Sequence, residues 1–150
     1  KDQTKMLIDE FMEKGDINYV VLLTHTFKSL LMEYGIDITP IFQKMGNYIG
    51  EYIFSQLYDE DLYIFMDNIS SYWLRNNLGK LYFKTDNSIR ITCIDCFESS
   101  YFPKSGMPVC SIEKGMLETL FNNYFKFDLK IEEIMCYSMG DDKCVFELQP

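Results

Sequence analysis

The sequence predicts an α+β fold in which amphipathic helices pack on an antiparallel β-sheet. Before residue 79, apolar residues recur at spacings of three and four, which is typical of helices. After it, residues 80–97 and 127–148 have the composition and turns of two β-hairpins, with another helical segment between them. A chain of 150 residues has the size of one domain with one core, so we expect residues 1–150 to form a single domain.

The first strong helical pattern covers residues 20–34 and ends at Gly35, and residues 4–14 fit a short helix before it. Apolar residues three and four positions apart make this segment an amphipathic helix. Its stripe consists of Val20, Leu23, Phe27, Leu30, Leu31 and Tyr34.

Two further helices are predicted between Thr39 and Gly79. The first begins where Thr39, a capping residue, precedes a proline at the first helical position, and the second follows the capping residue Asp61. Gly46 and Gly50 lie four residues apart, and we interpret them as packing residues that let another backbone approach closely. The two stripes are Ile41, Met45, Ile49, Ile53 and Leu57, and Leu62, Phe65, Met66, Ile69, Tyr72 and Trp73.

The second half of the chain changes to strand patterns. The two hairpins turn at residues 86–88 and around Gly140. Two prolines and a glycine predict an irregular crossover between the first hairpin and the last helix. The expected elements are strands over residues 80–85 and 89–97, a crossover over 99–108, a helix over 112–125, and strands over 127–138 and 143–148.

Charge and hydropathy exclude two classes of partner. The net charge is −9, and no stretch gathers Lys or Arg on one face, so nucleic acid and anionic membrane surfaces would be repelled. No apolar run reaches the roughly 18 residues that span a bilayer, and the N-terminus lacks the apolar segment of a signal peptide. We therefore expect a cytoplasmic protein without a membrane span. Because residue 1 is Lys, an upstream segment or an effector domain stays open.

Aromatic residues are abundant, at 16% of the chain with 12 Phe and 11 Tyr. This exceeds what a core of this size needs, so we expect rings to line a pocket or an interface.

The five cysteines indicate a metal site. A chain without an export signal keeps reduced thiols, and an odd count leaves one cysteine over in any scheme of disulfides. A turn centred on Gly140 makes Cys136 and Cys144 a cross-strand pair, with Cβ atoms about 4.5–5.5 Å apart. This suits two thiolates on one zinc ion, with a disulfide as the alternative. Cys110, at the start of a helix whose dipole favours a thiolate, supplies a third sulfur if the crossover folds back.

The pattern leaves the fourth ligand open. Glu133 lies three residues before Cys136, which in a regular strand places the two side chains on opposite faces. Glu133 therefore needs a β-bulge, whereas Glu132 shares the face of Cys136 without one. Should neither carboxylate bind, a water molecule completes the site.

Three other residues that often bind metals or cofactors are interpreted as structural. Cys93 and Cys96 form a CxxC pair, but inside a continuous strand their sulfur atoms point to opposite faces, so we expect small buried hydrophobic residues. His25, the single histidine, lies in an apolar helix and is expected to be a core residue rather than a haem ligand.

Residues 110–148 resemble the 4-vinyl reductase family of small-molecule-binding domains and the related sensor domains of phenol-responsive activators. In that family a cysteine precedes a glycine-containing helix, and the terminal hairpin carries E-x-x-C, G-D and C-x-F. The matching positions are Cys110, Gly115, Glu133, Cys136, Gly140, Asp141, Cys144 and Phe146.

The resemblance implies a metal set and a layout. It selects Glu133 over Glu132, so that Cys110, Glu133, Cys136 and Cys144 would hold one structural Zn²⁺ that closes the terminal hairpin. Related folds include the haem nitric-oxide sensors and a subunit class of vesicle-tethering complexes, whose members enclose an apolar pocket and often dimerise through helices.

Three functions follow as hypotheses. The first is a sensory or ligand-binding domain for a small hydrophobic or aromatic molecule, expected as a homodimer. The second is an assembly subunit similar to the tethering proteins, for which the nine methionines would suit an adaptable surface. The third is a reductase acting on a tetrapyrrole vinyl group, but no nucleotide-binding or catalytic motif supports it.

Overall fold

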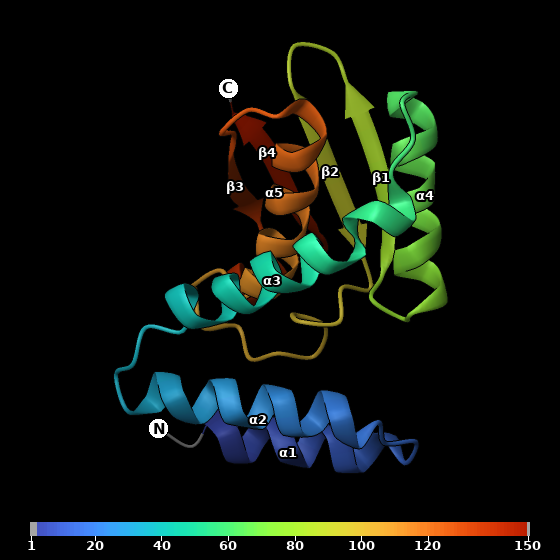
Figure 1. Cartoon of the computed structure of the whole chain (residues 1–150). Helices are drawn as coiled ribbons and strands as arrows, with labels where there is room; N and C mark the ends of the chain where they lie inside the picture. Colours follow the sequence, from blue (N-terminus) through green and yellow to red (C-terminus); the bar gives the residue numbers. More distant parts are fainter. Residues whose placement is uncertain (1–2, 150) are drawn as a thin grey trace.

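The computed structural model describes residues 3–149 and contains five α-helices, one short 3₁₀-helix and four strands within that range (Figure 1). Their order along the chain confirms the predicted α+β fold. The elements are α1 (Gln3–Lys14), α2 (Tyr19–Glu33), α3 (Thr39–Leu57), α4 (Leu62–Arg75), β1 (Lys80–Thr85), β2 (Ile89–Ile94), α5 (Ser111–Phe125), β3 (Lys130–Met135), η1 (Tyr137–Met139) and β4 (Cys144–Gln149).

The four strands form one antiparallel sheet in the order β1-β2-β4-β3. Each predicted hairpin is present, and β2 and β4 meet in the middle of the sheet. Ile91 and Phe146 face each other there and are both fully buried. Helix α4 packs on β1 and α5 packs on β3, so the helices cover the sheet while Tyr82 and Arg90 stay exposed (Figure 1).

Helices α3 and α5 cross with their backbones in contact, as expected for the two packing glycines. A Cβ atom on Gly46 would lie 2.0 Å from the carbonyl oxygen of Ile112, and one on Gly50 would lie 2.9 Å from that of Met116. Gly115 completes the contact from α5, because its Cβ would lie 2.2 Å from the carbonyl oxygen of Gln43. Any side chain at these positions would push the helices apart, so the glycines fix where α3 lies against α5.

Helices α1 and α2 form a hairpin beside the rest of the fold (Figure 1). A buried ion pair attaches it, with Lys28 Nζ 2.5 Å from Glu98 Oε2 and both side chains at 0% exposure. Glu98 also accepts hydrogen bonds from the backbone N–H groups of Ile112 and Glu113, at the start of α5. The pair therefore connects α2 to the first turn of α5.

The apolar stripe predicted for residues 20–34 does not face the core. Helix α2 buries Leu22, His25, Lys28 and Ser29 instead. The helix itself is confirmed, but burial of Lys28 with Glu98 turns the other side of the helix inward. The stripe residues Val20, Leu23, Phe27, Leu30 and Tyr34 are exposed by 41–81%.

Two predicted strands are longer than the observed ones. The segment 89–97 leaves the sheet after Ile94, and Asp95 then adopts a left-handed conformation with φ +56°. The segment 127–138 gives a strand only over Lys130–Met135, because η1 follows. No helix within residues 3–149 is long and apolar enough to cross a membrane.

Candidate metal centre and apolar groove

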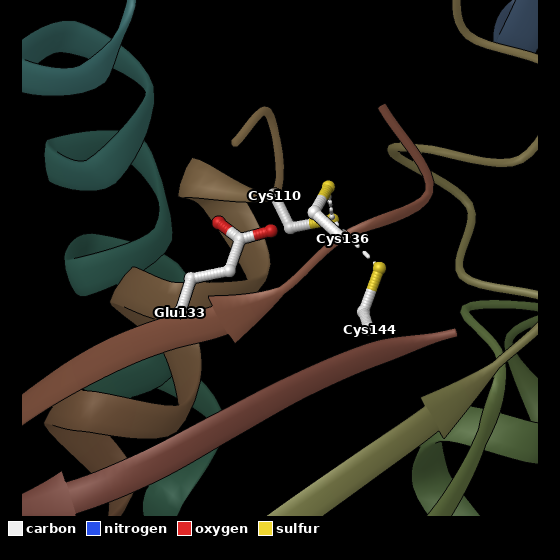
Figure 2. Close-up of side chains that lie close together, drawn as sticks. All are labelled: Cys110, Glu133, Cys136 and Cys144. Atoms are coloured by element: carbon white, nitrogen blue, oxygen red, sulfur yellow. Dashed lines mark hydrogen bonds between the residues drawn. The ribbon is translucent and has the colours of Figure 1, made fainter. Parts of the chain in front are cut away.

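The ends of three elements bring together the four residues predicted as metal ligands. Cys110 is the N-cap of α5, Cys136 follows the end of β3, and Cys144 is the first residue of β4. Together with Glu133 they place one ligand atom each within 4.8 Å of all the others (Figure 2). The three cysteines are buried thiols.

The sulfur positions fit a tetrahedral ion. Cys110 Sγ lies 3.3 Å from Cys144 Sγ and 3.8 Å from Cys136 Sγ. Two sulfur ligands at about 2.3 Å from a tetrahedral zinc ion are roughly 3.8 Å apart. The group can therefore hold a metal ion with little movement of its side chains.

A β-bulge places Glu133 with the sulfur atoms. Glu133 pairs with Phe146 and Met135 pairs with Val145, so the register shifts between them. The shift cancels the alternation that would point Glu133 and Cys136 to opposite faces. Glu133 Oε2 is buried and has no hydrogen-bond partner within residues 3–149, whereas Glu132 is exposed. Of the two candidates, only Glu133 belongs to the cluster.

The loop after β3 fixes the position of Cys136. Gly140 has φ +100° and ends η1, a conformation that favours glycine. Asp141 Oδ2 accepts a hydrogen bond from the backbone N–H of Cys136 at 3.0 Å. The G-D pair thus orients the third sulfur ligand through the backbone.

Burial strongly perturbs the acidic groups of this region. Burial, followed by the charge of Cys136, raises the pKa of Glu133 to about 9. Burial, followed by the charge of Glu98, raises the pKa of Glu113 to about 8. Burial also raises the pKa of the Cys110 thiol. Near neutral pH these groups hold protons that a metal ion would have to displace.

The expectation that Cys93 and Cys96 point apart is wrong. The left-handed turn at Asp95 brings their sulfur atoms together with Glu113, and the ligand atoms of these three residues also lie within 4.8 Å of one another. Periodicity could not show this, because one residue with positive φ ended the strand. The CxxC spacing itself was the available signal.

A second feature is an apolar groove of about 830 Å³ between α2 and α3. His25 lines it and is buried, and its Nε2 lies 2.9 Å from the carbonyl oxygen of Ser100. Burial lowers the pKa of His25 to about 4, so the ring is neutral at pH 7. A carbonyl only accepts hydrogen bonds, which assigns the proton to Nε2 and leaves Nδ1 as an acceptor without a partner in residues 3–149. Apolar side chains in the lining include Leu23, Phe27, Leu31, Ile41, Met45 and Phe97.

Sequence comparison relates this chain to the 4-vinyl reductase domain family. Residues 89–150 match the model of that domain, and this segment carries the metal cluster. The chain is also 31% identical over 81 residues to an uncharacterised protein of Methanocaldococcus jannaschii, MJ1642. The match covers 54% of this chain and 50% of that protein, so it spans about half the length of this relative.

Three solved structures share the fold. The phenol-responsive sensory domain of the transcription activator PoxR, with phenol, has a TM-score of 0.73 at 15% identity, covering 87% of this chain and 73% of that one. A vinyl-4-reductase family protein from M. jannaschii has a TM-score of 0.60 at 17% identity, covering 99% and 92%. An H-NOX protein from S. oneidensis has a TM-score of 0.52 at 14% identity, covering 97% and 88%. The predicted resemblance to the 4-vinyl reductase family is thereby confirmed through residues 89–150 and the common fold.

We predict that the metal-free protein loses stability as the pH rises from about 6.5 to 9. Glu113 and Glu133 have folded-state pKa values of about 8 and 9, above their ordinary 4.5. The folded state therefore keeps protons that the unfolded state has released. This contribution is complete below pH 4.5 and is lost as the pH rises through 8 and 9, by up to about 1.4 kcal/mol per pH unit for each proton.

Urea unfolding with a chelator present, at several pH values in this window, measures the effect. His25 is neutral in both states there and does not contribute. Glu133→Gln should flatten the dependence. A free energy of unfolding that stays constant or increases with pH would contradict the assignment.

Proposed function

We propose that residues 1–150 form a single ligand-binding or sensory domain that binds a small hydrophobic or aromatic molecule in the groove between α2 and α3. The groove carries this proposal. Its volume of about 830 Å³ and its largely apolar lining match the general properties of small-molecule sites. The common fold with a phenol-responsive sensory domain supports the same class of ligand.

The unpartnered nitrogen of His25 narrows the ligand class. A buried acceptor without a partner costs free energy, and a ligand with a hydroxyl or N–H group would satisfy it. We therefore expect an apolar ligand that carries one hydrogen-bond donor, such as a phenol.

The proposed metal is a structural Zn²⁺ on Cys110, Glu133, Cys136 and Cys144. Four protein ligands leave no position for water or substrate, so the ion would stabilise the fold rather than catalyse. It would pin the terminal hairpin to α5, and α5 holds one wall of the groove through the glycine contact with α3. Thiolate ligands require a reducing compartment, and we place the protein in the cytoplasm.

A second candidate role is self-assembly, and the exposed apolar side chains of α2 and α3 favour it. Large patches of this kind mark interfaces in soluble proteins. We propose a homodimer that uses this surface next to the groove. The exposed residues include Val20, Leu23, Phe27, Ile41, Tyr48 and Tyr52.

We predict that Glu133→Gln weakens zinc binding, because it replaces a carboxylate ligand by an amide. Mutation of a residue that only supports a metal ligand typically costs at least about 10-fold in affinity, so loss of a ligand itself should cost no less. Competition with a chromophoric chelator measures the change. Glu132→Gln is the matched control on the same strand, and equal losses in both variants would reject Glu133 as the fourth ligand.

For the groove, we predict that 4-ethylphenol binds to the protein at a ratio of one to one and that ethylbenzene binds roughly 2- to 10-fold more weakly. The difference is the hydrogen bond to His25, worth about 0.5–1.5 kcal/mol. Isothermal titration calorimetry measures both. Met45→Trp fills the groove and should weaken binding by at least about 10-fold, whereas Met12→Trp, on the exposed side of α1, should not. Equal effects of the two variants would contradict a site between α2 and α3.

For assembly, we predict a dimer in multi-angle light scattering at micromolar concentrations. Val20→Lys with Leu23→Lys places two charges on the exposed stripe and should give monomers, while keeping the far-UV circular dichroism of the helices. Lys substitutions at the exposed residues Tyr82 and Asn87, on the first hairpin, serve as the control. A wild-type monomer, or dimers of equal stability in both variants, would reject this interface.

A further inference from the structure

A second group of ligand atoms lies against the first. Cys93, Cys96 and Glu113 place one ligand atom each within 4.8 Å of one another, and all three side chains are buried. They come from the end of β2, the loop after it and the first turn of α5. None of them belongs to the four-residue cluster around Glu133.

We infer that Cys93, Cys96 and Glu113 hold a second thiophilic divalent cation, such as zinc, and that the sulfur atom of Cys110 bridges it to the first ion. This inference rests on the metal part of the proposed function, because Cys110 belongs to both sites.

The backbone is shaped to bring the two sulfur atoms together. Cys93 is in β2 and Cys96 follows the left-handed turn at Asp95, which has φ +56°. Gly79 makes room for the first of them, since a Cβ atom there would lie 2.6 Å from Cys93 Sγ, and its φ of +139° also disfavours a side chain. A pair of cysteines that served only as small apolar residues would not require this arrangement.

Glu113 is the observation that points to a cation. Its side chain is 0% exposed, Oε2 lies 3.1 Å from Cys96 Sγ, and Oε1 has no hydrogen-bond partner within residues 3–149. The buried ammonium group nearby, that of Lys28, is already paired with Glu98. A buried carboxyl group with an unsatisfied oxygen is costly unless something binds it, and a metal ion would use that oxygen.

Cys110 lies where a bridging ligand is needed. Its Sγ is 3.4 Å from Cys96 Sγ on one side and 3.3 Å from Cys144 Sγ on the other. Both distances are close to the edge of a zinc tetrahedron, roughly 3.8 Å. With Cys110 shared, each ion has four protein ligands, three sulfur atoms and one carboxylate oxygen.

The electrostatics favour two ions over one. Five thiolates and two carboxylates meet in this region, and two divalent cations offset four of their seven negative charges. The dipole of α5, whose N-cap is Cys110, and the hydroxyl of Ser99, 3.0 Å from Cys144 Sγ, act on the remainder.

A cation can reach this site from solvent. A cavity of about 180 Å³ is lined by Cys93, Cys96 and Cys144, together with the carboxylates of Asp95 and Asp142. The acidic side chains at this cavity attract cations, and the sulfur atoms at its wall belong to both proposed sites.

The test is the zinc content of the full chain, reconstituted under reducing conditions with excess zinc, desalted and measured by native mass spectrometry. We expect two zinc ions per chain in the wild type, one in Cys93→Ser and in Glu113→Gln, and two in the control Glu132→Gln. One ion in the wild type that is retained in Cys93→Ser and Glu113→Gln would overturn the second site alone. One ion that is lost in these variants but retained in Cys136→Ser would overturn the first site instead, and no ion would overturn both.

A titration of the wild type with Co²⁺ keeps the inference testable if a variant fails to fold. Sulfur-to-cobalt charge-transfer absorption should grow up to two equivalents of metal. Saturation at one equivalent would overturn the second site.

Discussion

The junction of α5 with the sheet concentrates buried thiol and carboxyl groups, and the arrangement of the other elements depends on how their charge is neutralised. Cys110 lies at the centre, with sulfur atoms of Cys96, Cys136 and Cys144 between 3.3 and 3.8 Å away. Such groups are stable inside a protein when they are protonated or when they share a cation. The fold therefore has two regimes, and in the second the terminal hairpin, α5 and the end of β2 are joined through metal ligands.

Both walls of the apolar groove connect to α5. Helix α3 contacts it through Gly46 and Gly50, where there is no room for a side chain. Helix α2 reaches its first turn through the buried pair of Lys28 and Glu98, which costs about 3–5 kcal/mol to break when one partner is removed. A ligand that changed the spacing of α2 and α3 would act directly on the helix that carries Cys110. This connection offers a physical route by which a sensory domain could transmit occupancy of the groove.

Most elements could be predicted from the sequence because their periodicity is strong and their ends carry clear signals. Asp61 caps α4 as expected, accepting a hydrogen bond from the N–H of Tyr63, and the turn around Gly140 is present. The side of α2 that faces inward could not be predicted, because a buried ion pair to a distant loop outweighs the apolar stripe. Nothing in the sequence around Lys28 marks it as buried, and its partner Glu98 lies 70 residues away.

The candidate site could be predicted in part for a related reason. The alternation rule left Glu132 and Glu133 open, and the resemblance to the family chose the residue that the bulge before Met135 brings to the sulfur atoms. The same rule separated Cys93 from Cys96, because it assumed a continuous strand where Asp95 has positive φ. Single-residue departures from regular backbone therefore decide the composition of this site, and they leave little trace in hydrophobic periodicity.

The central claim is that sulfur atoms and a carboxylate oxygen converge on one metal ion at the junction of α5 with the sheet. X-ray absorption at the zinc edge, on protein loaded with one equivalent of zinc, tests it most directly. The account predicts three sulfur atoms at about 2.3 Å and one oxygen at about 2.0–2.2 Å. A first shell of nitrogen and oxygen atoms alone would contradict it, and a shell of four sulfur atoms would exclude the carboxylate ligand.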